Sequence, residues 1–217
     1  MSPVHLVYCS GLVAGWSAWA GWLVAELLFF NSAAQPGTLQ AGLAGGIIAG
    51  PIGLGLGLLA GAAEGQGRRL LLRAATGLAS GCLGGIAGGL SGDLLAPCGL
   101  PQGIGWLIPG LGIGAANGLH ERSLSKTRNG LIGGAIGGLL GGLAFDPLQG
   151  LIATESGAAG RAIACVVLGV CTGTFIALAQ VLLKRRGKSP ETVAAAPAPL
   201  AGQVRTVPPP PRRPKSS

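Results

Sequence analysis

Charged side chains are scarce in this sequence. Asp, Glu, Lys and Arg together make up 10% of the 217 residues, against about a quarter in an ordinary soluble domain. The mean hydropathy of +0.58 is correspondingly high. A chain with so few charges lacks the side chains that normally cover a water-soluble surface. This shortage of charge therefore indicates an integral membrane protein.

Residue patterns of a catalytic or metal site are also missing. The five cysteines contain no CxxC pair, and Cys82, Cys165 and Cys171 fall inside apolar runs, where cysteine acts as a small packing residue. His5 and His120 are far apart in the sequence and neither has a cysteine or carboxylate pattern beside it. We therefore expect no metal site, no cofactor, no disulfide framework and no enzymatic activity.

Glycine is the residue in excess, with 42 copies. No G-X-Y period accompanies it, which excludes collagen, and its neighbours are Leu and Ile rather than the Ser and Gln of flexible linkers. Small residues mixed with aliphatic ones are what closely packed membrane helices require.

Six apolar stretches are long enough to cross a bilayer core of about 30 Å, which takes about 20 helical residues. They predict an all-α bundle of six transmembrane helices, at residues 6–30, 39–63, 70–92, 102–119, 129–152 and 160–183. The fourth stretch is the shortest and contains Pro109. The N-terminus has neither a positive region nor a cleavage site, so we expect an uncleaved first span. Residues 1–183 thus form one transmembrane domain.

The distribution of Lys and Arg predicts the orientation, because these residues accumulate on the cytoplasmic side. With the N-terminus in the cytoplasm, six of the 15 basic residues fall in cytoplasmic connectors and eight in the tail, leaving only Arg161 outside. We predict a bacterial inner-membrane protein with both termini cytoplasmic. The tail, residues 184–217, is basic and Pro-rich and is expected to be disordered.

The net charge of +8 does not predict nucleic-acid binding, because the basic residues form short clusters between apolar runs. The four consecutive prolines at 208–211 fit a partner that reads polyproline, or simply a solvated tail.

A two-helix unit occurs twice, at about residues 53–94 and 106–147. At an offset of 53 residues the second unit repeats six glycines, two leucines and the pair Asp93 and Asp146. Because each unit contains two spans, both copies have the same topology, which makes transporters built on inverted repeats less favoured.

Glycines in each unit recur every four residues and so share one helix face. The predicted packing positions are Gly77, Gly81, Gly85, Gly89, Gly130, Gly134, Gly138 and Gly142. A strip without side chains lets another backbone approach closely, which predicts glycine-zipper packing. Close packing within the chain is the main interpretation; a seam between copies in a homo-oligomer and a pore lined by backbone are the alternatives.

Carboxylates lie at the predicted outer ends of the spans. Glu26 is near the end of the first span, and Asp93, Asp146 and Glu155 are near the ends of the third, fifth and sixth. Ordinary placement at the membrane interface explains them. The alternative is an acidic outer vestibule in which Arg161 is an ion-pair partner.

Residues 40–183 resemble a glycine-rich multi-pass module of bacterial membrane proteins of unknown function, some of which carry a cytoplasmic forkhead-associated domain. The resemblance lies in three segments, GAAEGQGRR at 61–69, KTRNGLIGGAIGGLLGGLAFD at 126–146 and GRAIACVVLGVCTGTF at 160–175. The short Pro/Arg tail leaves no room for the reader domain here, so a phospho-signalling role is not implied. Nor does the resemblance imply any catalytic residue.

Two functions remain in view. The first is a membrane scaffold, anchor or regulatory partner, in contact with the lipid bilayer and with a membrane protein partner or a second copy. The alternative is a channel or a transporter of small solutes or ions. A water-filled path between spans three and five would support this alternative. A membrane-embedded enzyme ranks third, because titratable residues are missing at depth.

The predicted orientation can be checked with two reporters. Green fluorescent protein fused after Ser217 is expected to fluoresce and alkaline phosphatase at the same place to be inactive, because that end is placed in the cytoplasm by the loop charges. A phosphatase fused after Gly99, in an outer connector, is expected to be active. The opposite pattern at both positions would show that the orientation is reversed.

Overall fold

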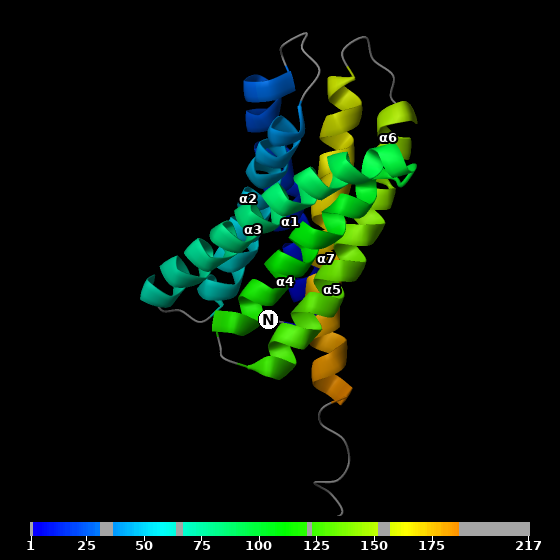
Figure 1. The fold of residues 1–217 in the computed structure, drawn as a ribbon. Coiled ribbons are helices and arrows are strands. Elements are labelled where there is room, and N and C mark those ends of the chain that lie inside the picture. Colours follow the sequence, from blue (N-terminus) through cyan, green and yellow to red (C-terminus); the bar gives the residue numbers. More distant parts are fainter. Residues whose placement is uncertain (1, 31–36, 64–66, 121–122, 152–156, 187–217) are drawn as a thin grey trace, which may run out of the picture.

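The computed structural model describes residues 2–30, 37–63, 67–120, 123–151 and 157–186, and the regular elements in these ranges are all helical (Figure 1). The α-helices are α1 (Pro3–Ala25), α2 (Thr38–Ala62), α3 (Gly67–Leu95), α4 (Leu107–His120), α5 (Leu124–Leu143), α6 (Phe145–Leu151) and α7 (Ala158–Arg186). A π-helical segment, η1 (Glu26–Phe30), extends α1, and two 3₁₀ segments, η2 (Ala96–Cys98) and η3 (Gln102–Trp106), join α3 to α4.

Five helical segments are long and apolar enough to cross a membrane. They are Pro3–Phe29, Thr38–Ala62, Gly67–Cys98, Leu124–Leu148 and Ala158–Leu183. An all-α, multi-pass membrane protein is thereby confirmed at this level of detail. The first segment begins slightly earlier than predicted, because the Ser2 hydroxyl accepts a hydrogen bond from the His5 N–H at 3.2 Å and Pro3 occupies the first helical position.

Two predicted spans differ from the observed helices, and a proline explains each difference. Residues 102–119 do not form one long helix: the chain starts as η3 and turns α-helical only at Leu107, which leaves Pro109 in the first turn of α4, where its missing N–H costs nothing. Residues 129–152 are likewise split between α5 and α6. In a continuous helix the Pro147 ring would clash with the carbonyl of Leu143.

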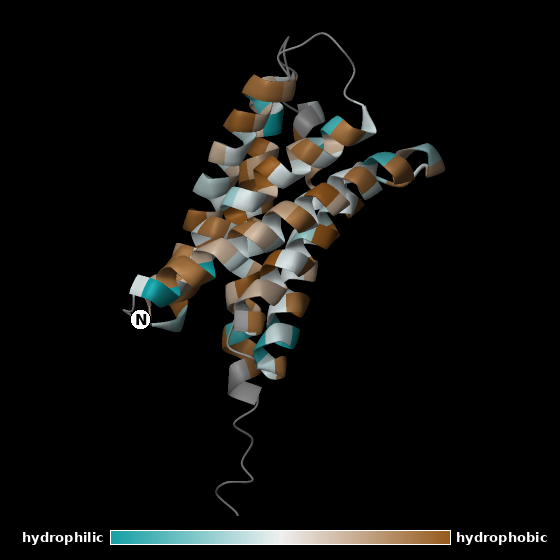
Figure 2. Ribbon diagram, turned by 60° about the vertical axis from the view of Figure 1, so that its left-hand side comes forward, coloured by the Kyte–Doolittle hydropathy of each residue, from teal (hydrophilic) through white to brown (hydrophobic). Residues whose placement is uncertain are grey.

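The helices form a closed ring. Along the chain α2 packs on α3, α3 on α4, α4 on α5 and α5 on α7, and the ring closes through α7 on α1 and α1 on α2. The start of α1, the ends of α2, α4 and α7 and the starts of α3 and α5 lie at the same end, the lower one in Figure 1. The helix surfaces are mainly apolar along their length, with hydrophilic residues toward their ends (Figure 2).

The two ends of the ring carry opposite charge. The lower end in Figure 1, here called the basic end, presents the exposed residues Arg68, Arg69, Lys126 and Arg128. At the other end, here called the acidic end, lie the described carboxylates Glu26, Asp93 and Asp146 together with Arg161.

An apolar cluster fills the interior of the ring on the side of the basic end. We call this cluster the apolar plug; its buried members are Ala14, Ala18, Ala49, Ile52, Leu56, Ile113 and Ile176. These residues come from α1, α2, α4 and α7, so the plug connects four of the helices of the ring. Ile52 and Ile176 are each only 2% exposed.

Neighbouring helices touch at glycines, backbone against backbone. A Cβ atom added to Gly85 would overlap the carbonyl oxygen of Gly45, and one added to Gly134 would overlap that of Gly110. Similar contacts join α3 to η3, where an added Cβ on Gly88 would lie 2.6 Å from the Gly105 oxygen. No side chain larger than hydrogen fits at these positions without moving a helix.

Within each predicted two-helix unit, glycines of the two helices face each other. The facing positions in the second unit are not those that an offset of 53 residues would give. Gly77 faces Gly53, and Gly130, 53 residues after Gly77, faces Gly114, which is 61 residues after Gly53. An offset of 53 residues in both helices would instead have placed Gly130 opposite Trp106. Both hairpins close over the same separation, with Gly61 against Leu70 and Gly118 against Thr127, so the facing glycines Gly114 and Gly130 lie about one helical turn nearer to their connection than Gly53 and Gly77 do.

Alanine substitution tests the close approach of α2 and α3. Gly85→Ala is expected to lower the free energy of unfolding by about 1–3 kcal/mol, because a methyl group must displace the Gly45 carbonyl. Thermal unfolding of the purified protein in detergent is the measurement. Gly150→Ala is the matched control: an added Cβ there meets nothing within 4 Å, so its stability should be unchanged or slightly raised. Equal stability of both variants would contradict the close contact.

Candidate functional site: a polar cavity at the acidic end

A cavity of about 230 Å³ lies inside the ring toward the acidic end. Residues of α1, α2, α3 and α7, four of the six helices of the ring, line it together with residues of η3 and α6. Most of the wall is apolar and includes three aromatic side chains. The side chains that matter for its chemistry are Trp22, Asp93, Trp106, Phe145, Arg161 and Cys165.

The cavity reaches well into the bundle but does not pass through it. Trp22 lies eight residues before the end of η1 and Cys165 seven residues after the start of α7, so at about 1.5 Å per residue the cavity extends about 10–12 Å below the acidic end. Ile48 lines its wall, and Ile52, one turn further along α2, already belongs to the apolar plug. The plug therefore closes the cavity on the side of the basic end.

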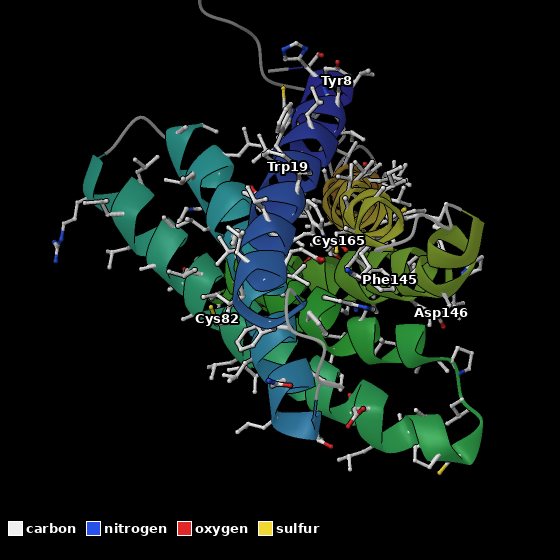
Figure 3. All side chains as sticks on the ribbon, turned by 90° about the horizontal axis from the view of Figure 1, so that it is seen from above. Tyr8, Trp19, Cys82, Phe145, Asp146 and Cys165 are labelled. Carbon is white, nitrogen blue, oxygen red and sulfur yellow. The ribbon has the colours of Figure 1, made fainter. Side chains whose placement is uncertain are left out.

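Seen from above, Phe145 and Cys165 lie toward the middle of the bundle, and Asp146 lies further out (Figure 3). Cys165 is fully buried and belongs to an apolar cluster with Ala25, Ala44 and Ile48, against which Phe145 packs. Aliphatic and aromatic groups from four elements thus surround the few polar groups of the cavity.

Arg161 forms an ion pair with Glu26. Its Nε donates to Oε2 at 3.1 Å and its Nη2 donates to Oε1 at 2.5 Å, a two-bond geometry that favours guanidinium–carboxylate pairing. The side chains are only 22% and 18% exposed, respectively. The pair ties the start of α7 to the end of α1 and thereby fastens the ring where it closes.

The predicted outer polar cluster is only partly assembled. Asp93 and Arg161 line the same cavity, whereas Asp146 is exposed on α6 and does not line it. Glu155 lies outside the described residues. Arg161 forms an ion pair with Glu26, which was predicted from the sequence only as a carboxylate near the outer end of the first span. The sequence did contain a signal for this ion pair, because a carboxylate and an arginine lie near the outer ends of the first and last spans.

Asp93 differs from Glu26 in its surroundings. Its side chain is half-buried in the cavity wall, and within the described ranges it makes no hydrogen bond or ion pair. A carboxylate in a mostly apolar wall is costly to keep charged without a partner. Asp93 is therefore the position at which the cavity would favour a cation.

Trp22 was not singled out for chemistry from the sequence. Its spacing with Trp16 and Trp19 indicates packing or lipid contact, and Trp16 and Trp19 do form an edge-to-face pair with ring centroids 5.7 Å apart. Trp22, however, lines the cavity, and its indole nitrogen is buried without a hydrogen-bond partner among the described residues. Buried donors normally have a partner, so this nitrogen marks a place for an acceptor.

The predicted packing glycines lie in the helix interfaces, with seven of them buried and Gly89 half-buried in the cavity wall. Across the described ranges, His, Cys, Asp and Glu side chains form no group of three that could hold a metal ion. The cavity and the adjoining Glu26–Arg161 pair form one group of polar side chains, and the buried Arg73 and Asn129 lie apart from it on α3 and α5.

No protein-family model matches the chain, and neither the curated proteins nor the solved structures contain a significant match. The resemblance of residues 40–183 to a glycine-rich multi-pass module therefore stays a prediction. What stands is a helical, multi-pass membrane-type protein with a mostly apolar cavity, containing a few polar side chains, at one end.

Breaking the ion pair tests whether it holds the ring closed. Glu26→Gln is expected to lower the free energy of unfolding by about 1–3 kcal/mol, less than for a fully buried pair that loses one partner, because both side chains are partly exposed. The double variant Glu26→Arg/Arg161→Glu should recover part of this loss. Asp146→Asn, at an exposed position of the same end, is the control and should leave thermal unfolding in detergent unchanged. A Glu26→Gln protein as stable as the control would argue against a structural role for the pair.

Proposed function

We propose that this chain is a non-enzymatic membrane protein that acts as a scaffold, anchor or regulatory partner of another membrane component. The observation that carries the proposal is the closed ring, in which helices pack backbone against backbone around an apolar plug. Such close contacts make a bundle stiff. A stiff bundle is suited to holding its two ends, and whatever binds them, in a fixed relation.

The glycine ladders are, in this proposal, zippers within one chain and belong to two duplicated hairpins, α2–α3 and α4–α5. Support comes from Gly77 and Gly81, which face α2, and from Gly130 and Gly134, which face α4. Because these faces are already occupied within the chain, they are not free to form a seam between copies. Self-association would instead use the outer surfaces of the ring.

The basic end is the surface proposed to meet a cytoplasmic partner. Arg68, Arg69, Lys126 and Arg128 are exposed there, and their charge favours an acidic protein or the anionic headgroups of the cytoplasmic leaflet. This placement corresponds to the predicted bacterial inner membrane with cytoplasmic termini. The polyproline segment at 208–211 lies outside the described residues and stays a prediction.

A small-solute or ion transporter is the second candidate, and the cavity at the acidic end is the observation that favours it. Two features oppose an open path in this conformation. α4 and η3 lie between α3 and α5, where a water-filled path would have supported transport, and the apolar plug closes the cavity below. Transport would therefore require the helices around Ile52 and Ile113 to separate.

Crosslinking with the full chain tests the scaffold proposal. An amine- and carboxyl-reactive crosslinker applied to native membranes is expected to yield one or a few discrete complexes, because a scaffold holds defined partners. Neutralising the basic end with Arg68→Gln, Arg69→Gln, Lys126→Gln and Arg128→Gln should reduce their yield several-fold, whereas Asp146→Asn at the opposite end should not.

The proposal fails if the chain stays uncrosslinked as a monomer both in native membranes and after reconstitution. Proteoliposomes containing the same purified protein measure solute flux in parallel. Saturable flux would replace the scaffold proposal with the transporter, and its absence would leave the scaffold as the function that the crosslinked complexes support.

A further inference from the structure

We propose that the cavity at the acidic end binds an ammonium group that carries an oxygen acceptor close by, as in an amino alcohol or in a lipid headgroup built on one. This ligand class goes beyond the scaffold role. It follows from four features of the cavity: its charge, its rings, its unsatisfied donor and its size.

Charge comes first. Among the described residues, three side chains of the Asp, Glu, Lys and Arg types lie in or beside the wall: Asp93, Arg161 and Glu26. The two hydrogen bonds between Arg161 and Glu26 pair one positive with one negative charge, and Asp93 makes no ion pair within the described residues. The formal balance of the three is therefore one negative charge. In a poorly hydrated, mostly apolar wall such a charge attracts a monovalent cation more strongly than it would in water.

The aromatic rings favour an organic ammonium ion over a hydrated metal ion. Trp22, Trp106 and Phe145 all line the cavity, and the rings of Trp106 and Phe145 have centroids 5.8 Å apart at an interplanar angle of 41°. Faces of tryptophan and phenylalanine attract ammonium groups, and clusters of such rings recur in sites for choline-like ligands. Oxygen ligands for a metal ion are, by contrast, limited in this wall to the Asp93 carboxylate and backbone carbonyls.

An unsatisfied hydrogen-bond donor in the cavity wall indicates the second group of the ligand, an oxygen acceptor. The indole N–H of Trp22 is buried and has no acceptor in the described part of the chain. Leaving such a group without a partner is unfavourable. A hydroxyl or phosphate oxygen a few bonds from the ammonium group would satisfy it while the ammonium group approaches Asp93.

Size restricts the ligand further. At about 230 Å³ the cavity is smaller than the roughly 300–1,000 Å³ of pockets for drug-sized ligands. It has room for a small amine or for a headgroup alone, with any acyl chains outside the ring. The depth of about 10–12 Å from the acidic end suits a group that enters from the water or from the adjacent leaflet.

Ethanolamine chemistry thus has two possible sources, a free amine and a lipid headgroup, and the experiment separates them. The full-length protein is reconstituted in nanodiscs of phosphatidylglycerol only. Ethanolamine is titrated while calorimetry and tryptophan fluorescence record binding. A parallel set of nanodiscs contains phosphatidylethanolamine in half of the lipid, and native mass spectrometry records which lipid stays bound to the protein.

Asp93→Asn is expected to weaken ethanolamine binding about tenfold or more, because it removes the charge that attracts the ammonium group. Asp146→Asn is the matched control, since Asp146 is the repeat-related aspartate, lies at the same end and does not line the cavity. It should bind as the unchanged protein does. Thermal unfolding of both variants shows whether each is folded.

Trp22→Phe provides an independent arm, because it keeps a ring and removes only the N–H donor. It is expected to weaken ethanolamine binding several-fold while leaving ethylamine, which lacks the oxygen, unaffected. If phosphatidylethanolamine abolishes the ethanolamine signal and remains bound in the mass spectrum, the occupant is a lipid headgroup. If the signal persists, the occupant is a free amine.

The proposal is overturned if neither ethanolamine nor phosphatidylethanolamine binds, or if Asp93→Asn and Asp146→Asn affect binding equally. Equal losses for ethanolamine and ethylamine in Trp22→Phe would overturn the assignment of the indole N–H. None of these outcomes depends on crosslinked partners, so the ligand site and the scaffold role stand or fall separately.

Discussion

The carbonyl oxygens of one helix lie against glycines of the next, and the rest of the structure depends on this contact. Inside a bilayer, apolar side chains gain little by leaving lipid for protein, so helix association relies on dispersion forces and weak Cα–H···O bonds that require close approach. Gly45 and Gly85, or Gly110 and Gly134, provide that approach because neither member of the pair has a side chain. The helices themselves persist despite their glycines, because lipid offers no other partner to backbone N–H and C=O groups.

Closing the ring divides its interior into two unlike parts. Toward the basic end, branched side chains such as Ile52 and Ile113 meet in the centre and leave an apolar plug. Toward the acidic end, the lining residues on α2 and α3 include Gly45, Gly88 and Gly92, which supply no side chain, and a cavity remains between the aromatic residues. The Glu26–Arg161 pair stands beside this cavity and joins the first helix to the last.

Local signals explain most of what could be predicted from the sequence. Five spans follow from length and apolarity, and the ladder positions follow from a spacing of four on one helix face. The difference at residues 102–119 was also local, because the chain starts as η3 and becomes α-helical only at Leu107, with Pro109 in the first turn of α4; Pro147 follows the turn at Ala144 that separates α5 from α6 within the span Leu124–Leu148. Counting apolar residues could not detect these breaks, because hydropathy does not register a missing N–H.

By itself, the sequence determined that the chain is helical and suited to lipid. It also determined where the charged residues gather and which helix faces consist of glycines and can approach another helix closely. Only the tertiary structure decided which faces meet. Gly77 faces Gly53, whereas Gly130, 53 residues later, faces Gly114, 61 residues after Gly53, and Arg161 pairs with Glu26, 135 positions away. Periodicity describes one helix at a time. Partners and registers depend on connection lengths and on how several helices fill space together, which no single stretch of sequence contains.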